Sequence, residues 1–285
     1  MEISHNNQIM HSDTFEIAHK LDKDFTTVEM HSHDFYELYY FIHGHTSFIV
    51  DGKKYSLKSG DILLISPTNL HQLDIRDTKE IYERDVIWIN QSYIRDISTR
   101  TTDLSSCFRL SNEKGHHLVR NARLSNYVSE EIQLMNKLSL SASFGSDIEK
   151  ETHLKNILIR LGNYLLHTED DPIFKENSTV NKAISYIDEH LTEDLSLDYL
   201  SSQLFINKYY LSHIFREYTN TSPHKYILKK RLLLSKELIS KGYKINEVYK
   251  ESGFKDYTHF FKAFKDEYKT TPREYLKSIK KMTSD

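Results

Sequence analysis

Three histidines and one glutamate near the N-terminus stand at spacings that can build a ligand site. They are His31, His33, Glu37 and His71. His31 and His33 are two residues apart, so on a β-strand their side chains project to the same side, where Glu37 and His71 can converge with them. Three imidazoles and one carboxylate suit iron, manganese, zinc or nickel. The alternative is a set of hydrogen-bonded structural histidines that hold no ligand.

The elements that must position this cluster are short strands between residues 25 and 90. Residues 36–42, 47–50, 61–65 and 85–89 are rich in aromatic and β-branched side chains, and turns at Gly44, Asp51-Gly52 and Gly60 separate the first three. Asp51-Gly52 predicts a type I′ hairpin, because that turn needs a positive φ, which glycine accepts. Short strands at this spacing indicate a small barrel or sandwich.

From residue 125 the apolar residues recur at helical spacing. They form two stripes, Val128, Ile132, Met135 and Leu138, then Leu154, Ile157, Leu158, Leu161 and Leu165. The two helices either pack on the strands or form a dimerisation segment at about 120–167. Residues 168–179 combine acids, a proline and small polar residues, a composition typical of an exposed linker. We therefore expect domains at 1–167 and 180–285, joined by the linker 168–179.

Composition favours a two-domain, helix-rich protein. A chain of 285 residues is long enough for two cores, and 8 glycines and 4 prolines are too few for a disordered or collagen-like chain. A single cysteine cannot form an internal disulfide, so nothing points to an oxidising compartment. No apolar run is long enough to span a membrane, and residues 1–13 lack a signal-peptide pattern. The expected location is the cytoplasm, with no membrane partner.

The charge is unevenly distributed along the chain. The net charge is −3, yet residues 180–285 carry 19 Lys/Arg against 14 Asp/Glu. Within them, residues 208–281 carry 18 Lys/Arg against 8 Asp/Glu. This concentration favours a polyanionic partner; the alternative is a solvated basic surface.

The basic region contains an internal repeat. At an offset of 49, residues 210–227 align with 259–276, so that Phe215 matches Phe264 and Pro223 matches Pro272. Upstream, Asn207 matches Asp256, and both are good N-cap residues. Each copy predicts a short helix, a tight turn and a second helix that ends before a Ser/Thr-Pro pair, which is a helix-turn-helix. Two such motifs in tandem can enter successive major grooves of one duplex.

Residues on the outer face of each second helix are the candidate DNA-binding residues, because early residues of a recognition helix approach base edges. A helix of about 19 residues joins the copies, and a wheel places Lys225, Lys229 and Lys236 on a basic face opposite a core face. The predicted DNA-binding residues are Lys208, Tyr209, Ser212, His213, Arg216, Lys225, Lys229, Tyr257, Thr258, Phe261, Lys262 and Lys265.

The C-terminal hundred residues resemble the DNA-binding domain of AraC/XylS-type transcription regulators. The resemblance rests on residues 195–227, on Arg231-Leu232 and on residues 245–276, which include Gly253-Phe254 and the Phe-Phe-Lys-x-Phe-Lys run at 260–265. It implies a bacterial regulator that binds double-stranded promoter DNA, with RNA polymerase as a partner if the protein is an activator. A homodimer is a further possibility that the family admits.

The N-terminal half resembles the cupin-like sensing domain common in that family, over about residues 25–90. The matching residues are His31-Ser32-His33, Glu37, Gly44, Gly60-Asp61, Pro67 and His71. The resemblance implies that this pocket receives a small organic effector, with the histidines as polar contacts. Metal binding by the same His31, His33, Glu37 and His71 is the second interpretation, and the sequence establishes no cofactor.

The predicted fold is an α+β multidomain chain. It has an N-terminal cupin-like β-barrel with packing helices and a C-terminal all-α domain with two helix-turn-helix motifs. The predicted function is that of a sequence-specific DNA-binding transcription regulator, not an enzyme. A metal-dependent cupin enzyme fused to a nucleic-acid-binding module is the alternative, and a nonspecific architectural DNA binder is a third class. No Gly-rich phosphate loop, Cys-x-x-Cys pair or nucleophile elbow supports catalysis.

Overall fold

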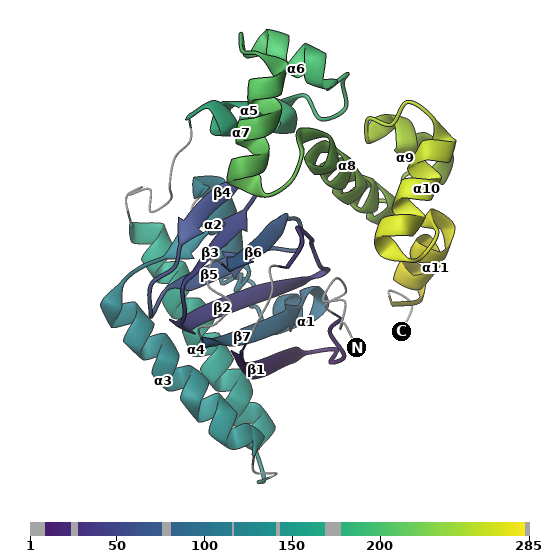
Figure 1. Ribbon diagram of the computed structural model, residues 1–285. Coiled ribbons are helices and arrows are strands. Elements are labelled where there is room, and N and C mark those ends of the chain that lie inside the picture. The colour runs from purple at the N-terminus through teal and green to yellow at the C-terminus, as the bar shows by residue number, and fades with distance from the viewer. Residues whose placement is uncertain are drawn as a thin grey trace. The chain divides into compact units, whose positions relative to one another are not determined.

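The computed structural model describes residues 9–23, 28–75, 81–115, 117–140, 143–168 and 178–282 (Figure 1). The chain divides into two compact units, residues 1–176 and 177–285. Strands and helices make up the first unit, and helices make up the second. Of the predicted linker 168–179, residues 169–177 lie outside the described residues. Among the helices that are described, none has the length and apolar character needed to cross a membrane.

Two antiparallel sheets form the framework of the first unit. The larger has the strand order β1-β7-β2-β5-β8, and the smaller has the order β4-β3-β6. The predicted segments 36–42, 47–50, 61–65 and 85–89 correspond to β2, β3, β5 and β7. The strands are β1 (Phe15–Asp22), β2 (Phe35–His43), β3 (Thr46–Val50), β4 (Lys53–Ser56), β5 (Ile62–Ile65), β6 (His71–Ile75), β7 (Tyr82–Asn90) and β8 (Leu118–Val119).

The described strands do not close into the barrel that the sequence predicts. In the larger sheet β1 and β8 each have one neighbouring strand, so both are edges. The backbones of His31 and His71 form an isolated bridge at one end of the small sheet. The predicted hairpin between β3 and β4 is confirmed, because Asp51 and Gly52 have φ values of 43° and 74°.

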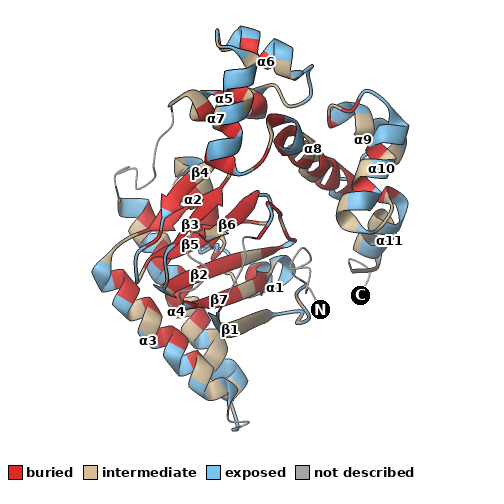
Figure 2. Cartoon of the chain, viewed as in Figure 1, coloured by how far each residue is buried: buried red, intermediate tan, exposed pale blue. Residues whose placement is uncertain are grey.

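The inner strands β2 and β5 of the larger sheet are buried on both faces, which explains their nearly continuous apolar sequences, whereas the edge strand β1 is only partly buried (Figure 2). In β2, Leu38 and Tyr40 face a core shared with the helices, whereas Tyr39 and Phe41 face a core shared with the smaller sheet. This alternation follows from the two-residue period of a strand. The larger sheet is therefore the middle layer of the unit, with helices on one side and the smaller sheet on the other.

The helices of the first unit bury the two predicted apolar stripes against the larger sheet. Those stripes lie in α3 (Ala122–Ser139) and α4 (Ser146–His167), and all their residues except the half-buried Leu138 join the same core. Helix α1 (Gln91–Asp96) follows β7, and α2 (Ser106–Lys114) carries the single cysteine, Cys107, into this core. The stripes are therefore core residues of the unit itself.

Seven helices form the described part of the second unit. They are α5 (Ser178–Glu189), α6 (Leu197–Gln203), α7 (Lys208–Thr219), α8 (Pro223–Ser240), α9 (Ile245–Glu251), α10 (Tyr257–Tyr268) and α11 (Pro272–Met282). The predicted caps are confirmed, since the Asn207 side chain accepts the backbone N–H groups of Tyr209 and Tyr210, and Asp256 accepts that of His259. Pro223 and Pro272 begin α8 and α11, as the Ser/Thr-Pro pairs predict.

Apolar side chains from α8 to α11 form one core. Buried Val248 of α9 meets buried Phe260 and Phe264 of α10, and Leu232 and Ile239 of α8 complete the cluster. The earlier pair is built alike, with Leu200 of α6 and Leu211 and Phe215 of α7 buried. Each short helix thus packs on the longer helix that follows it.

Gly253 closes α9 in the left-handed region, with φ +84°. A Cβ added there would lie 2.7 Å from the Leu191 carbonyl oxygen and 2.8 Å from Nε of Arg231. That Nε donates a hydrogen bond to the same carbonyl at 2.9 Å, so Leu191 and Arg231 cannot move away from an added Cβ without straining or breaking this bond. Close packing and backbone conformation therefore both require glycine.

Gly253→Ala is expected to destabilise the second unit more than Gly242→Ala does. Both positions have a positive φ, which costs a side-chain-bearing residue about 1–2 kcal/mol. A Cβ at Gly242 meets nothing within 4 Å, so only Gly253→Ala adds a steric clash. Urea denaturation of the full chain, followed by far-UV circular dichroism, measures the difference. Equal losses for the two variants would contradict this account of the close approach.

Candidate functional site

The histidine cluster forms where the chain entering β2 meets the start of β6. His31 and His71 exchange backbone hydrogen bonds of 3.0 and 2.9 Å. His33 follows in an irregular segment and not in a regular strand, while Glu37 lies within β2. The predicted convergence of these side chains therefore depends on the backbone bridge between His31 and His71 and on the first residues of β2.

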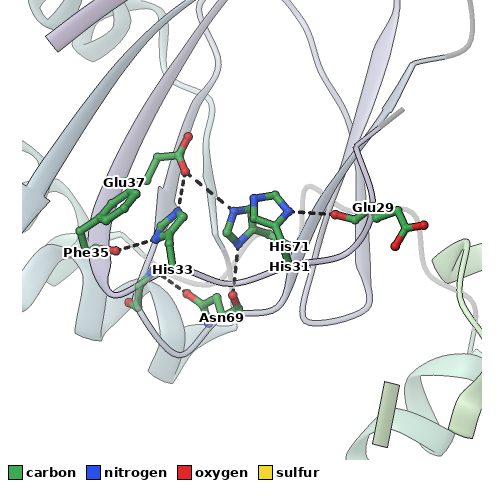
Figure 3. A network of polar contacts seen from close by, with 8 residues as sticks. Glu29, His31, His33, Phe35, Glu37, Asn69 and His71 are labelled. Atoms are coloured by element: carbon green, nitrogen blue, oxygen red, sulfur yellow. Dashed lines mark hydrogen bonds and ion pairs between the residues drawn. The ribbon is translucent and has the colours of Figure 1, made fainter. Parts of the chain in front are cut away.

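Each imidazole is oriented by a backbone carbonyl two residues away (Figure 3). The Nδ1 atoms of His31, His33 and His71 lie 2.9, 2.9 and 3.2 Å from the carbonyl oxygens of Glu29, Phe35 and Asn69, respectively. A carbonyl oxygen can only accept, so each Nδ1 carries the hydrogen. The tautomer of all three rings is thus set by the main chain, as is common for metal-binding histidines.

Glu37 brings the cluster together. Its Oε2 lies 2.8 Å from Nε2 of His33 and 3.8 Å from Nε2 of His71 (Figure 3). These three atoms all lie within 4.8 Å of one another, and the three residues are buried, with Glu37 only 4% exposed. The ring of His31 packs against that of His71, with 4.2 Å between centroids. The structure therefore brings together all four residues that the sequence singles out.

Burial and neighbouring charge shift the acidities within the cluster. Burial, together with the nearby His31 and His33, holds the pKa of His71 well below its usual value, so this ring is neutral at neutral pH. Burial by itself would raise the pKa of Glu37, but the close contact with His33 and the influence of His31 and Lys20 lower that pKa below its usual value. The site therefore combines a carboxylate with at least one neutral imidazole.

The cluster opens onto a cavity of about 40 Å³ between the two sheets. Apolar side chains such as Phe48 and Val86 line part of it, and Lys20, Arg84 and Trp88 line the rest. A water needs roughly 10–15 Å³ on this scale, so the cavity has room for a few waters or a small ligand.

Two cationic side chains on the cavity wall come from facing strands. Lys20 of β1 lies directly opposite Arg84 of β7, and Arg84 forms an ion pair with Asp22. Burial, and then the charge of Arg84, lower the pKa of Lys20. The Lys20 ammonium lies 4.8 Å from the ring centroid of Trp88, whose buried Nε1 has no hydrogen-bond partner.

Sequence reasoning missed Lys20, Arg84 and Trp88 as cavity residues. Arg84 and Trp88 lie 64 and 68 positions after Lys20 in the chain, and only the pairing of β1 with β7 brings the three side chains together. The available signal was the alternation in β7, where Arg84, Val86 and Trp88 share one face.

The candidate DNA-binding residues lie mainly on α7 and α10. On α7, Tyr209, His213 and Arg216 are exposed, with Tyr209 74% exposed, whereas Lys208 and Ser212 are half-buried. Lys208 also donates to Asp198 of α6 at 2.7 Å. On α10, Tyr257, Thr258, Lys262 and Lys265 are exposed and Phe261 is half-buried. Each helix thus presents aromatic and basic side chains on one outer face.

The predicted basic face of the joining helix is wrong for two of its three lysines. Lys229 is only 8% exposed and forms an ion pair with Glu267 of α10. Lys236 is equally buried, and its ammonium lies 4.6 Å from the ring centroid of Tyr268. Helices α10 and α11 pack on this side of α8, so the basic stripe faces protein. Lys225, near the start of α8, remains exposed.

Further exposed aromatic residues lie around the first helix pair. Tyr210 of α7 and Tyr199 of α6 are exposed, and Phe205, in the turn between these helices, is 95% exposed. Phe205 also has a positive φ of 54°, which is rare for a bulky residue. The sequence offered only their aromatic character as a signal, and it left them out of the candidate set.

Two family models match this chain. The AraC-like ligand binding domain matches residues 17–158, and a helix-turn-helix domain matches residues 200–278. The first range contains the histidine cluster, and the second contains α7 to α10 with parts of α6 and α11. They correspond to the two kinds of candidate site that the geometry defines.

Curated relatives and solved structures were also found. The regulatory protein PocR of Salmonella typhimurium is 30% identical over 104 residues, 36% of this chain and 34% of PocR. The transcriptional activator RhaS of Escherichia fergusonii is 21% identical over 251 residues, 86% of each chain. The C-terminal domain of AraT, a response regulator from Geobacillus stearothermophilus, is 26% identical, with a TM-score of 0.35 over 36% of this chain and 86% of that one. Apo ToxT from Vibrio cholerae is 16% identical, with a TM-score of 0.39 over 93% and 97%.

The fold and the matched domains define a transcription regulator with a ligand-binding domain followed by a helix-turn-helix domain. The chain belongs to the AraC/XylS family of transcription regulators. The resemblance inferred from residues 195–227 and 245–276 is thereby confirmed.

Lys229→Ala and Lys225→Ala are expected to have different effects. Lys229→Ala leaves Glu267 half-buried without its ion-pair partner and should cost about 1–3 kcal/mol of stability. Lys225→Ala should leave stability nearly unchanged and, if Lys225 contacts phosphate, reduce the salt dependence of DNA binding by about one unit of slope. Urea denaturation and binding titrations at several salt concentrations measure the two effects. A stable Lys229→Ala variant with weakened DNA binding would restore the original assignment.

Proposed function

We propose that this protein is an effector-responsive, sequence-specific regulator of bacterial transcription that acts in the cytoplasm. Its effector binds in the cavity beside Glu37, and α7 and α10 each enter a major groove as the second helix of a helix-turn-helix. The observation that carries the proposal is the repeated helix pair, capped by Asn207 and Asp256, with exposed basic and aromatic side chains on both longer helices. A capped helix of this kind is the usual reader of base edges.

The span of α8 supports reading by both helix pairs. It has 18 residues, which at 1.5 Å per residue gives a rod of about 27 Å. Successive major grooves on one side of a duplex are about 34 Å apart. Pairs held at the two ends of such a rod suit adjacent grooves, so one chain would read two half-sites.

The proposed DNA-contacting residues differ in role. Arg216 and Lys262 can donate to guanine or to phosphate, whereas Tyr209 and Phe261 offer apolar contact to a thymine methyl group. The proposed surface is completed by Lys208, Ser212, His213, Lys225, Tyr257, Thr258 and Lys265, and it excludes the buried Lys229.

Lys262→Ala tests whether α10 reads bases. If Lys262 contacts a base, the variant should lose about 1–3 kcal/mol of binding to the cognate promoter and relax specificity at one position. Lys241→Ala, an exposed lysine outside the proposed surface, is the matched control. Competition titrations with promoter and random duplexes measure both. Equal losses on the two duplexes would reduce Lys262 to a phosphate contact.

The cavity charges favour an acidic effector. Like charges directly opposite on paired strands are destabilising, and Lys20 faces Arg84 in this way. The ion pair of Arg84 with Asp22 offsets this repulsion only in part, because Arg84 lowers the pKa of Lys20 more than any neighbouring carboxylate raises it. A carboxylate or similar group in the cavity would offset that repulsion and would satisfy the Trp88 N–H. The effector class that we propose is therefore a small organic acid.

Trp88 is the single tryptophan of the chain, so its emission reports directly on this cavity. We expect small carboxylic acids to change Trp88 fluorescence and the neutral amides of the same acids not to. Lys20→Gln should weaken binding of the acid about tenfold or more, whereas Lys58→Gln, at an exposed position in the same unit, should not. Preferential binding of the amides, or no effect of Lys20→Gln, would contradict the proposal that the effector is an organic acid.

Two protein partners belong to this proposal. Exposed Phe144, just before α4, and exposed Ile148, in its first turn, offer apolar surface for a homodimer. As an activator, the protein would also contact RNA polymerase.

A metal-dependent cupin enzyme is the alternative function, and turnover of a substrate that requires His33 and His71 would favour it.

A further inference from the structure

The hydrogen-bond pattern of the cluster places two hydrogen-bond acceptors, one on His33 and one on Glu37, against each other. The Nδ1–H of His33 is committed to the Phe35 carbonyl, so a neutral His33 presents only a lone pair at Nε2. That Nε2 lies 2.8 Å from a carboxylate oxygen, which also presents only lone pairs. Two acceptors at this distance repel each other unless a proton or a cation lies with them.

His71 adds a second lone pair to the same point. Its Nδ1–H donates to the Asn69 carbonyl, and its Nε2 is buried without a hydrogen-bond partner, 3.8 Å from the same Glu37 oxygen. A proton on His33 would satisfy one of these contacts but not the contact with His71. A cation that accepts electron pairs from all three atoms satisfies both.

The distances fit such a cation. Zinc-bound nitrogen lies at about 2.0–2.1 Å, so two donors on a tetrahedral ion are about 3.4 Å apart. The donor atoms here are separated by 2.8 and 3.8 Å across Glu37, and all three lie within 4.8 Å of one another. Small side-chain shifts would bring them to a common centre.

The surroundings have the features of a metal site with an open position. Each imidazole is held by a carbonyl through its second nitrogen, the arrangement that fixes ligating histidines. The adjoining cavity of about 40 Å³ has room for a water or a small donor group as a further ligand. Two imidazoles and a carboxylate with an open position suit zinc, iron(II), cobalt or nickel better than calcium or magnesium.

We propose that His33, Glu37 and His71 bind one divalent first-row transition-metal ion in the sensor unit. The proposal rests on the proposed function only in placing the ion beside the effector cavity. There the ion would supply a positive centre to which an acidic effector can coordinate. His31, packed on the His71 ring, holds that ring in place.

The test uses the full-length protein, stripped with a chelator and titrated with Co²⁺ and then Zn²⁺. We expect one Co²⁺ per chain, visible d–d absorption and quenching of Trp88 emission, because rings link His33 through Phe35 to Trp88 with centroids 3.9 and 4.9 Å apart. Zn²⁺ should displace Co²⁺ and remove the absorption. His33→Ala, His71→Ala and the isosteric Glu37→Gln should weaken Co²⁺ binding at least tenfold.

His43→Ala is the matched control, because this exposed histidine lies at the end of β2, the strand that carries Glu37. It should bind Co²⁺ like the wild type. Circular dichroism and DNA titrations on the same samples establish that each variant is folded. No Co²⁺ or Zn²⁺ uptake by the wild type, or equal uptake by the folded variants, would overturn the metal site. Specific DNA binding and acid-dependent Trp88 fluorescence in those samples test the proposed function separately.

Discussion

The pair of backbone hydrogen bonds between His31 and His71 is the contact on which the sensor site depends. It ties the chain entering β2 to the first residue of β6, and these belong to different sheets. Without it, two imidazoles would lie on segments with no reason to meet. Main-chain carbonyls then orient the rings, so the site is specified largely by backbone geometry. A few side chains can therefore carry chemistry inside an otherwise apolar layer.

The middle position of the larger sheet explains how the site is shielded. One face of the sheet is covered by helices and the other by the smaller sheet, so the cluster lies between two packed layers. Desolvation there strengthens every charge interaction, which is why Glu37 and His71 shift in pKa. The cost of burying a carboxylate is offset only by partners that approach it closely.

Local features of the fold could be predicted from the sequence, and long-range ones could not. Asp51-Gly52, Asn207 and Asp256 act within a few residues of themselves, and all three behave as predicted. Strands β1, β6 and β8 are not among the predicted segments, because β1 and β6 are interrupted by polar residues and β8 has only two residues. A helical wheel placed Lys229 correctly on α8 but could not show that α10 covers that side. The four cluster residues could be predicted because histidines and a glutamate at these spacings are typical of a ligand site. Lys20 and Arg84 could not be predicted, because only the register of β1 on β7 brings them together.

The buried cysteine has a practical consequence. Cys107 is enclosed in the core under α2, and burial raises the pKa of its thiol to about 12. The reactive thiolate is therefore almost absent at neutral pH while the fold is intact. We therefore expect Cys107 to react only slowly with maleimides while the chain is folded. Single cysteines introduced on α7 and α10 could be labelled selectively, and the distance between two spin labels would then report how the helix pairs move on DNA.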